Sequence, residues 1–456
     1  MKTYDVTAGP PSPTPGFAVR SWFIDGVSPQ ASRPFVQGLP TTPQEFLAQL
    51  PPSGFSCWVR GTAGLVGIGR ALRLSATGPD RFTALSQAWQ AISAAAAVDN
   101  EVGLQGSGLI GFAAIAFSAH STTASVIDIP QYVMGRRDGR VWLTAVSTPD
   151  SPADPDALTL AHAPLSLPRE PRIHPGRVSA ESYVDIVARA VERLRQGADA
   201  GAGAGADPLG KVVLARDEVV ETAEDIDVRA VLGRLNSAYP NCWTFDVAGL
   251  VGATPELLIG VFEGQVTSRV LAGTYQVEDD PAAEIAAART QLGSAKDTRE
   301  HAFAIDSLAA SLGPVTADLH VDAEPHLLQL PTVIHLASDA HGTLRSGPDG
   351  LPSALDVAAA VHPTAAVGGF PKDRALDVIE ELEGADRGRF AGPVGWVDDR
   401  GNGQFGIALR CGQLEEPHRI RLFAGAGIMP DSDPAAEFAE TEAKLAPMKR
   451  ALGVDG

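Results

Sequence analysis

The chain has 456 residues, 44% of them hydrophobic and 20% charged, so it is long and apolar enough for a sizeable core and is not a disordered chain. Lysine and arginine number 36 against 55 aspartate and glutamate, and the resulting net charge of −19 disfavours nucleic acid and anionic membranes as partners. To bind an anionic substrate, such a chain must build a local positive patch, and a bound divalent cation is the simplest way to do so.

The N-terminal residues and the cysteines indicate a cytoplasmic protein. Residues 1–5 lack the basic segment followed by an apolar core that marks a signal peptide, and the apolar run 91–98 is too short to span a bilayer. Cys57, Cys242 and Cys411 are odd in number and far apart, which fits neither a disulfide framework nor a pair of metal ligands. We therefore expect a cytoplasmic protein that does not contact membranes.

Residues 1–30 are rich in Pro, Gly and Ser and are expected to be a loose lead-in to a single domain over residues 31–456. A helix is predicted at 82–97, and the segment 147–177, dense in Pro and Asp, is typical of a linker across the fold. Short apolar runs between Gly-rich turns predict strands at 57–59, 108–113 and 141–146.

A helix is predicted after Ser179, which is its expected N-cap. Apolar residues recur at helical spacing from Tyr183 to Leu194, and Gly197 supplies a stop. The alternating glycine and alanine residues of 201–206 predict a flexible loop. This loop has neither the spacing nor the preceding strand of a phosphate-binding loop, so we expect no nucleotide site there.

The C-terminal half is predicted to be mostly strands, with two helices at about 282–312 and 434–452. Strands that follow one another through short turns favour antiparallel pairing with helices packed outside. The expected fold class is therefore α+β, a single large α/β sandwich with extended, mainly antiparallel sheets. The strands predicted here are 212–214, 243–245, 257–259, 394–397, 405–409 and 420–423.

The last predicted helix carries Glu437, Glu440 and Lys444 on one narrow face, because they are spaced i, i+3 and i+7. One interpretation is a solvated face with a Glu–Lys pair at i, i+4. The other is a ligand site, since the face borders an apolar stripe and follows a predicted turn at 425–427, whose bare backbone N–H groups could hold a carboxylate.

Glu300 lies in a similar charged pattern, residues 296–301, which taken alone also fits a surface helix. Together, Glu300 and Glu440 could give Mg²⁺ two carboxylate oxygens, with water and substrate completing an octahedron. Spacing in the sequence leaves open whether the two helices meet.

Lys211 opens an otherwise apolar strand, and Glu256 lies between Pro255 and the apolar run 257–259. The lysine is either an edge residue that discourages aggregation or a partly desolvated group that gives up its proton and acts as a base. Burial of Glu256 would raise its pKa toward that of a general acid. A lysine base and a glutamic acid on opposite sides of a substrate would form a push–pull pair.

These segments, in this order, resemble the chorismate-utilising enzyme family, which includes isochorismate, salicylate, anthranilate and aminodeoxychorismate synthases. The resemblance covers about 179–452 closely and 108–146 loosely, and nine ordered motifs are far more specific than any one of them. The motifs are KVVLAR from Lys211, GATPELLIG from Gly252, LAGT from Leu271, KDTREH from Lys296, PTVIHLAS from Pro331, HPTAAVGGFP from His362, GRFAGPVGW from Gly388, IALRC from Ile407 and FAGAGIMPDSDPAAEFAETEAK from Phe423.

The resemblance implies an enzyme that needs Mg²⁺ and no organic cofactor. Lys211 would be the general base on water and Glu256 the general acid. Glu300 and Glu440 would be magnesium ligands, with Glu437 close by. Arg410, Lys444 and the Gly425 backbone would hold the substrate's carboxylates. The substrate pocket implied by the resemblance consists of Gly273, Thr274, His335, Ala366, Phe390, Leu409, Arg410, Gly425 and Lys444.

Single residues within these motifs also indicate which branch of the family the chain resembles. Amination enzymes generally rely on a glutamine-hydrolysing partner, and lyases also expel pyruvate. Ala366 and Phe390 stand where those branches tend to have Thr and Tyr, as in isochorismate synthases, whereas Leu409 resembles the lyase branch more. The resemblance therefore favours an isochorismate synthase, an isomerase that adds water at C2 of chorismate as the C4 hydroxyl leaves, with salicylate synthase as the alternative.

A non-catalytic binding module is a further alternative, although the intact set of Lys211, Glu256, Glu300 and Glu440 argues against it. We expect chorismate as the small-molecule substrate, a monomer, and no glutamine amidotransferase partner. The product would enter menaquinone or catecholate siderophore biosynthesis, of which we favour menaquinone.

Overall fold

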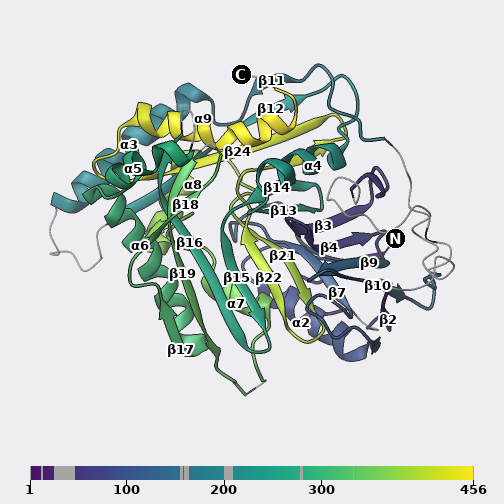
Figure 1. The fold of residues 1–456 in the computed structure, drawn as a ribbon. Coiled ribbons are helices and arrows are strands. Elements are labelled where there is room, and N and C mark those ends of the chain that lie inside the picture. The colour runs from purple at the N-terminus through teal and green to yellow at the C-terminus, as the bar shows by residue number, and fades with distance from the viewer. Residues whose placement is uncertain are drawn as a thin grey trace.

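The chain folds into two large β-sheets with helices packed against them (Figure 1). The structure, a computed structural model, describes residues 2–11, 14–24, 47–154, 158, 164–199, 209–277, 281–331, 333–348 and 350–454. The predicted glycine–alanine loop at 201–206 lies outside these residues. Within them, no helix combines the length and the apolar character that crossing a membrane requires.

The first sheet has eleven strands, paired antiparallel except for β1 with β5. Its order in space is β1 (Lys2–Asp5), β5 (Leu72–Ala76), β8 (Ser125–Ile129), β7 (Ile110–Ala114), β21 (Pro393–Asp398), β22 (Gly403–Ile407), β15 (Leu257–Phe262), β16 (Gln265–Gln276), β19 (Val333–Leu344) and β17 (Thr316–Val321), with β18 (His326–Gln329) also beside β19.

The second sheet has thirteen strands, paired antiparallel except for β2 with β6. Its order is β11 (Arg172–Pro175), β12 (Lys211–Glu221), β24 (Arg419–Ile428), β23 (Cys411–Glu416), β14 (Leu250–Thr254), β13 (Trp243–Val247), β3 (Phe55–Arg60), β4 (Ala63–Ile68), β9 (Tyr132–Arg137), β10 (Arg140–Ser147), β2 (Ala18–Phe23) and β6 (Ala97–Asn100), with β20 (Gly369–Phe370) also beside β12. The predicted α+β class with mainly antiparallel sheets is confirmed.

The described part of residues 1–30 is not a loose lead-in, because it contributes a strand to each sheet. β1 pairs with β5 and β2 pairs with both β10 and β6. The backbone groups of these short strands form hydrogen bonds with strands that are distant in the sequence. The local content of Pro and Gly cannot reveal such pairing.

The described residues form eight α-helices, three of which the sequence patterns did not predict: α4, α7 and α8. The helix predicted over 282–312 is two helices, because Gly293 interrupts it and Ser294 caps the second with a side-chain bond to the N–H of Asp297. The helices are α2 (Arg81–Ala95), α3 (Ala180–Asp199), α4 (Val228–Ala238), α5 (Pro281–Leu292), α6 (Ala295–Leu312), α7 (Ala354–Val361), α8 (Lys372–Glu383) and α9 (Pro434–Ala451).

The two sheets share one core. Trp58 on β3 and Ile259 on β15 belong to the same cluster of buried apolar residues, although their strands lie in different sheets. Trp58 also donates its indole N–H to Gln404 of β22 at 3.1 Å. In Figure 1, α3, α8 and α9 gather at the top of the molecule, where α9 packs on β24, α3 on α9 and α8 on β12.

Two of the short links at which the chain passes from one sheet to the other lie side by side. Pro255 and Glu256 join β14 to β15, and residues 408–410 join β22 to β23. Backbone hydrogen bonds connect the links: the N–H of Ala253 donates to the Arg410 carbonyl and the N–H of Ile407 to the Glu256 carbonyl, both at 3.2 Å. The fold thus fixes two charged residues beside each other where the sheets meet.

Candidate active site

One cavity gathers most of the residues that the sequence singled out. Strands β12 and β24 of the second sheet, β16 and β19 of the first, and helices α6 and α9 all contribute to its wall. The space among these residues that no atom fills amounts to about 710 Å³, open solvent included. The predicted residues that line it are Glu256, Gly273, Thr274, Glu300, His335, Ala366, Phe390, Leu409, Arg410, Gly425, Glu440 and Lys444.

Glu256 is a buried carboxyl group that faces this cavity. Only 2% of the residue is exposed, and its Oε1 atom has no hydrogen-bond partner among the described residues. Burial raises the pKa of Glu256 to about 8, even though the nearby cations Lys211, Arg410 and Lys444 act in the opposite direction. Glu256 therefore keeps its proton at neutral pH, which is the state that a general acid requires.

Lys211 is buried beside the cavity and is not an edge residue. It is 1% exposed and lies at the start of β12, where β20 pairs with it on one side. Its Nζ lies 3.1 Å from Oε1 of Glu300, which lines the cavity. A Cβ atom at Gly427 would lie 2.3 Å from that same oxygen, so a larger residue there would force the Glu300 carboxylate to shift. The edge interpretation of this lysine is therefore wrong.

Arg410 and His335 form a hydrogen-bonded pair in the wall of the cavity. Arg410 Nη2 donates to His335 Nε2 at 3.0 Å, and because an arginine can only donate, Nε2 must be the acceptor. The proton of His335 is then on Nδ1, which donates to the Gly273 carbonyl at 3.1 Å. Burial, followed by Arg410 and Lys444, holds the pKa of His335 well below its ordinary value, in agreement with a neutral ring.

The backbone conformation at Gly273 and at Arg410 helps to position the Arg410–His335 pair. Gly273 is an extra residue in β16, where the register with β19 shifts, and its φ of 78° favours glycine. The bulge turns its carbonyl toward His335. Arg410 also has a positive φ, 48°, a conformation that costs a non-glycine residue energy and is concentrated at functional sites.

The acidic face of α9 is buried at Glu437 and partly buried at Glu440 and Lys444, so the interpretation as a solvated face is wrong. Glu437 is 2% exposed, and the side chains of Glu440 and Lys444 are 21% and 15% exposed. Lys444 Nζ lies 2.5 Å from Glu440 Oε1 and donates to the Gly425 carbonyl at 2.8 Å. The predicted turn at 425–427 is also wrong, because these residues lie within β24, where small residues allow close approach to β12.

The donors at Glu300 and Glu440 fit a magnesium ion. Both are carboxylates that line the same cavity, and carboxylate oxygens are the ligands that Mg²⁺ prefers. Each carboxylate is paired with an ammonium group, Glu300 with Lys211 and Glu440 with Lys444, so both already attract positive charge. Glu437 lies one helical turn before Glu440 on α9.

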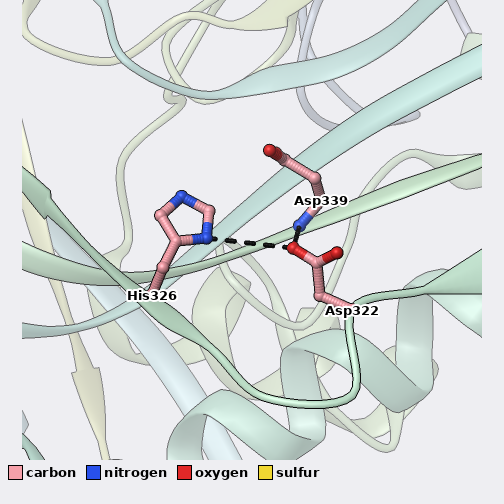
Figure 2. Close-up of side chains that lie close together, drawn as sticks. All are labelled: Asp322, His326 and Asp339. Carbon is pink, nitrogen blue, oxygen red and sulfur yellow. Dashed lines mark hydrogen bonds and ion pairs between the residues drawn. The ribbon is translucent and has the colours of Figure 1, made fainter.

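Another cluster, at the edge of the first sheet, superficially resembles a metal site. In the described part of the chain, Asp322, His326 and Asp339 are the one group of three His, Cys, Asp or Glu side chains whose ligand atoms all lie within 4.8 Å of one another. Figure 2 shows Asp322 between His326 and the backbone N–H of Asp339. Asp322 and His326 are exposed, and both oxygens of the Asp339 carboxylate accept from Arg269, at 2.6 and 2.7 Å, so this cluster is explained as a surface hydrogen-bond network.

Several lining residues were missed by the sequence analysis. Val213 and Ala215 follow Lys211 at steps of two, and strand alternation could have placed them on its face. No sequence pattern indicated Arg387. The remaining missed residues are Pro255, Leu271, Ala272, Val367, Ala391, Phe423, Ala424 and Gly427.

Comparison with known proteins gives a consistent result. Residues 42–453 match the family described as chorismate binding enzyme. The chain is 40% identical over 276 residues to isochorismate synthase DhbC of Bacillus subtilis, covering 58% of this chain and 68% of that protein. It is 33% identical over 414 residues to the salicylate biosynthesis isochorismate synthase of Pseudomonas aeruginosa, covering 85% of this chain and 82% of that protein. In fold it is similar to MenF, the menaquinone-specific isochorismate synthase of Escherichia coli, with a TM-score of 0.74 at 22% identity over 96% of this chain and 95% of that one.

Proposed function

The chain belongs to the chorismate-binding enzyme family, and we propose that it is an isochorismate synthase. The observation that carries the proposal is Glu256, a carboxyl group that burial keeps protonated in a cavity lined by cations. Relatives named as isochorismate synthases, at 33–40% identity, support the choice of reaction.

Chorismate has two carboxylates, a 4-hydroxyl group and a ring diene. Arg410 and Lys444 are placed to bind the carboxylates, since both are cations that line the cavity of a chain whose net charge is −19. Arg410 gains orientation from His335, which accepts its hydrogen bond. These groups would hold the ring with its C4 oxygen toward Glu256.

The proposed reaction uses one base and one acid. Water adds at C2 and gives a proton to Lys211, the ring double bond shifts, and the C4–oxygen bond breaks as Glu256 donates its proton to the departing oxygen. The oxygen leaves as water, so atoms balance and the net change is an isomerisation. To act as base, Lys211, whose Nζ lies 3.1 Å from Oε1 of Glu300, must first lose its own proton.

We propose that Glu300 and Glu440 hold Mg²⁺, with Glu437, on the same helix as Glu440, supporting them. When bound, the ion would supply positive charge at the ring carboxylate and withdraw electron density from the ring. A magnesium requirement is consistent with the carboxylate donors described above.

We propose isomerisation in place of pyruvate elimination because of two wall positions. Ala366 and Phe390 line the cavity without a hydroxyl group, and the Phe390 ring stacks on Phe423 with centroids 5.1 Å apart. Neither side chain can orient the enolpyruvyl group through a hydrogen bond. A salicylate synthase remains the second candidate, because Leu409 resembles that branch.

Product analysis tests the proposal. With chorismate and Mg²⁺, chromatography should show isochorismate, and a coupled lactate dehydrogenase assay should show little pyruvate. Pyruvate released in step with chorismate loss would identify a salicylate synthase. Binding of chorismate without turnover would identify a binding module.

A further inference from the structure

Strand β12, which carries Lys211, has a gap along one edge. On one side it pairs with β24 from Val212 to Glu221. On the other side β20 pairs only with Lys211 and Val212, and β11 pairs only with 218–221. Residues 213–217 therefore have no strand neighbour on that side within the described residues, directly after the proposed base.

One buried ion pair fills much of this gap. Glu383, the last residue of α8, accepts the N–H of Ala215 at 2.7 Å, and Arg387 donates from Nη2 to the Val213 carbonyl at 2.7 Å. These are backbone groups that a neighbouring strand would otherwise satisfy. The N–H of Val213 donates in addition to the Gly368 carbonyl at 2.9 Å.

The pair is itself almost fully satisfied. Arg387 and Glu383 side chains are 5% and 3% exposed, and Nε of Arg387 donates to Glu383 at 2.9 Å, with a second short contact from Nη2. Nη1 donates to the Val367 carbonyl at 3.0 Å, and the guanidinium lies 4.5 Å from the ring centroid of Phe117. Buried pairs of this kind contribute little net stability but fix geometry strongly.

Arg387 therefore connects two walls of the cavity. It bonds Val213 on the strand of Lys211 and Val367 next to Ala366, and all of these except Lys211 line the cavity. We propose that Arg387 and Glu383 are a positioning pair that replaces a missing strand along 213–217, directing Lys211 toward the substrate and fixing the wall at Ala366. This inference rests on the proposed function, because the positioned lysine is its base.

Arg387→Lys and Glu383→Gln test the positioning. A lysine cannot bond Val213, Val367 and Glu383 in the same plane as a guanidinium can, and a misplacement of about 1 Å can cost ~10²-fold in rate. We expect kcat to fall about 10- to 100-fold in both variants, with KM changed less than about threefold. Glu383→Gln keeps the shape of the side chain, so it remains informative if the arginine variant does not fold.

Arg229→Lys is the matched control. Arg229 is also a buried arginine in an ion pair, with Asp227 at 2.8 Å, and it also donates to a backbone carbonyl, that of Leu50. It does not line the cavity. We expect its kcat to stay within about twofold of the wild type. An equal loss of kcat in this control would show that general destabilisation lowers the rate of Arg387→Lys, and would overturn the proposal.

A double mutant separates positioning of the base from a merely structural role. If Arg387 acts through Lys211, Arg387→Lys should lower the residual rate of Lys211→Ala by a smaller factor than it lowers the wild-type rate. The same fold loss in both backgrounds would overturn the proposal.

Amide hydrogen exchange tests the ion pair independently of activity. We expect amides within 213–217 to exchange at least about tenfold faster in Arg387→Lys than in the wild type, and to be unchanged in Arg229→Lys. Unchanged exchange in Arg387→Lys would overturn the positioning role even in an active enzyme. A wild type that does not convert chorismate would instead overturn the proposed function, while exchange still decides whether the pair holds the strand.

Discussion

Replacing Glu256 with Gln should stabilise the protein at alkaline pH while it abolishes turnover. Glu256 has a pKa of about 8 in the folded chain against an ordinary value of 4.5, because burial disfavours the charged form. The folded chain therefore holds a proton that the unfolded chain releases. The corresponding stability is fully present below pH 4.5, declines as the pH rises, and is lost above pH 8.

The size of the effect follows from the two pKa values. Between pH 5.5 and 7.5, the free energy of unfolding of the wild type should fall by about 2.5 kcal/mol relative to Glu256→Gln. Urea unfolding of both proteins at several pH values measures this difference. Taking the difference removes the contributions of Asp246 and Asp398, whose pKa values burial raises to about 7 and about 6.

Asp246→Asn is a matched control for the same experiment. Asp246 is a buried carboxyl with a raised pKa, but it does not line the active-site cavity. Its variant should change the pH dependence of stability and keep turnover. A difference between the wild type and Glu256→Gln that stays flat from pH 5.5 to 7.5 would refute the view that burial keeps Glu256 protonated.

Three further predictions concern the reaction. Lys211→Ala should lower kcat by about 10²–10⁴-fold while chorismate binding remains measurable by calorimetry, and a loss below tenfold would remove Lys211 as the base. Glu300→Gln and Glu440→Gln should each raise the half-saturating Mg²⁺ concentration in turnover assays, whereas wild-type activity that survives chelation would exclude the metal. Replacing Ala366 with Thr and Phe390 with Tyr together should increase pyruvate release in the coupled assay, because the added hydroxyls could hold the enolpyruvyl group nearer its elimination geometry; unchanged release would remove these positions as determinants.

Local patterns in the sequence predicted the elements that have strong periodicity. The helix after Ser179 and the strand from Lys211 are present, since an apolar face or run is visible within a short window. Helix α7 could also have been predicted, because Ser353 and Asp356 form a capping box at its start. The strands of residues 1–30 could not, because their partners are far away in the sequence.

The residues of the candidate site, too, could be predicted from the sequence only in part. Motif order indicated the residues that line the cavity, but it could not show that Glu437 and Lys211 are buried, since both also fit a surface pattern. The neutral form of His335 depends on its contact with Arg410, and the role of Arg387 depends on a gap in strand pairing. Both features arise only when distant segments pack together.

The origin of the new hydroxyl group tests the central claim most directly. Chorismate should be converted in water enriched in ¹⁸O, with Mg²⁺ present, and the isochorismate analysed by mass spectrometry. If Lys211 activates water for addition at C2 and Glu256 expels the C4 oxygen, the product carries one ¹⁸O atom in its ring hydroxyl. Isochorismate without the label would contradict the account, because the C4 hydroxyl would then have moved within the substrate without water entering the ring.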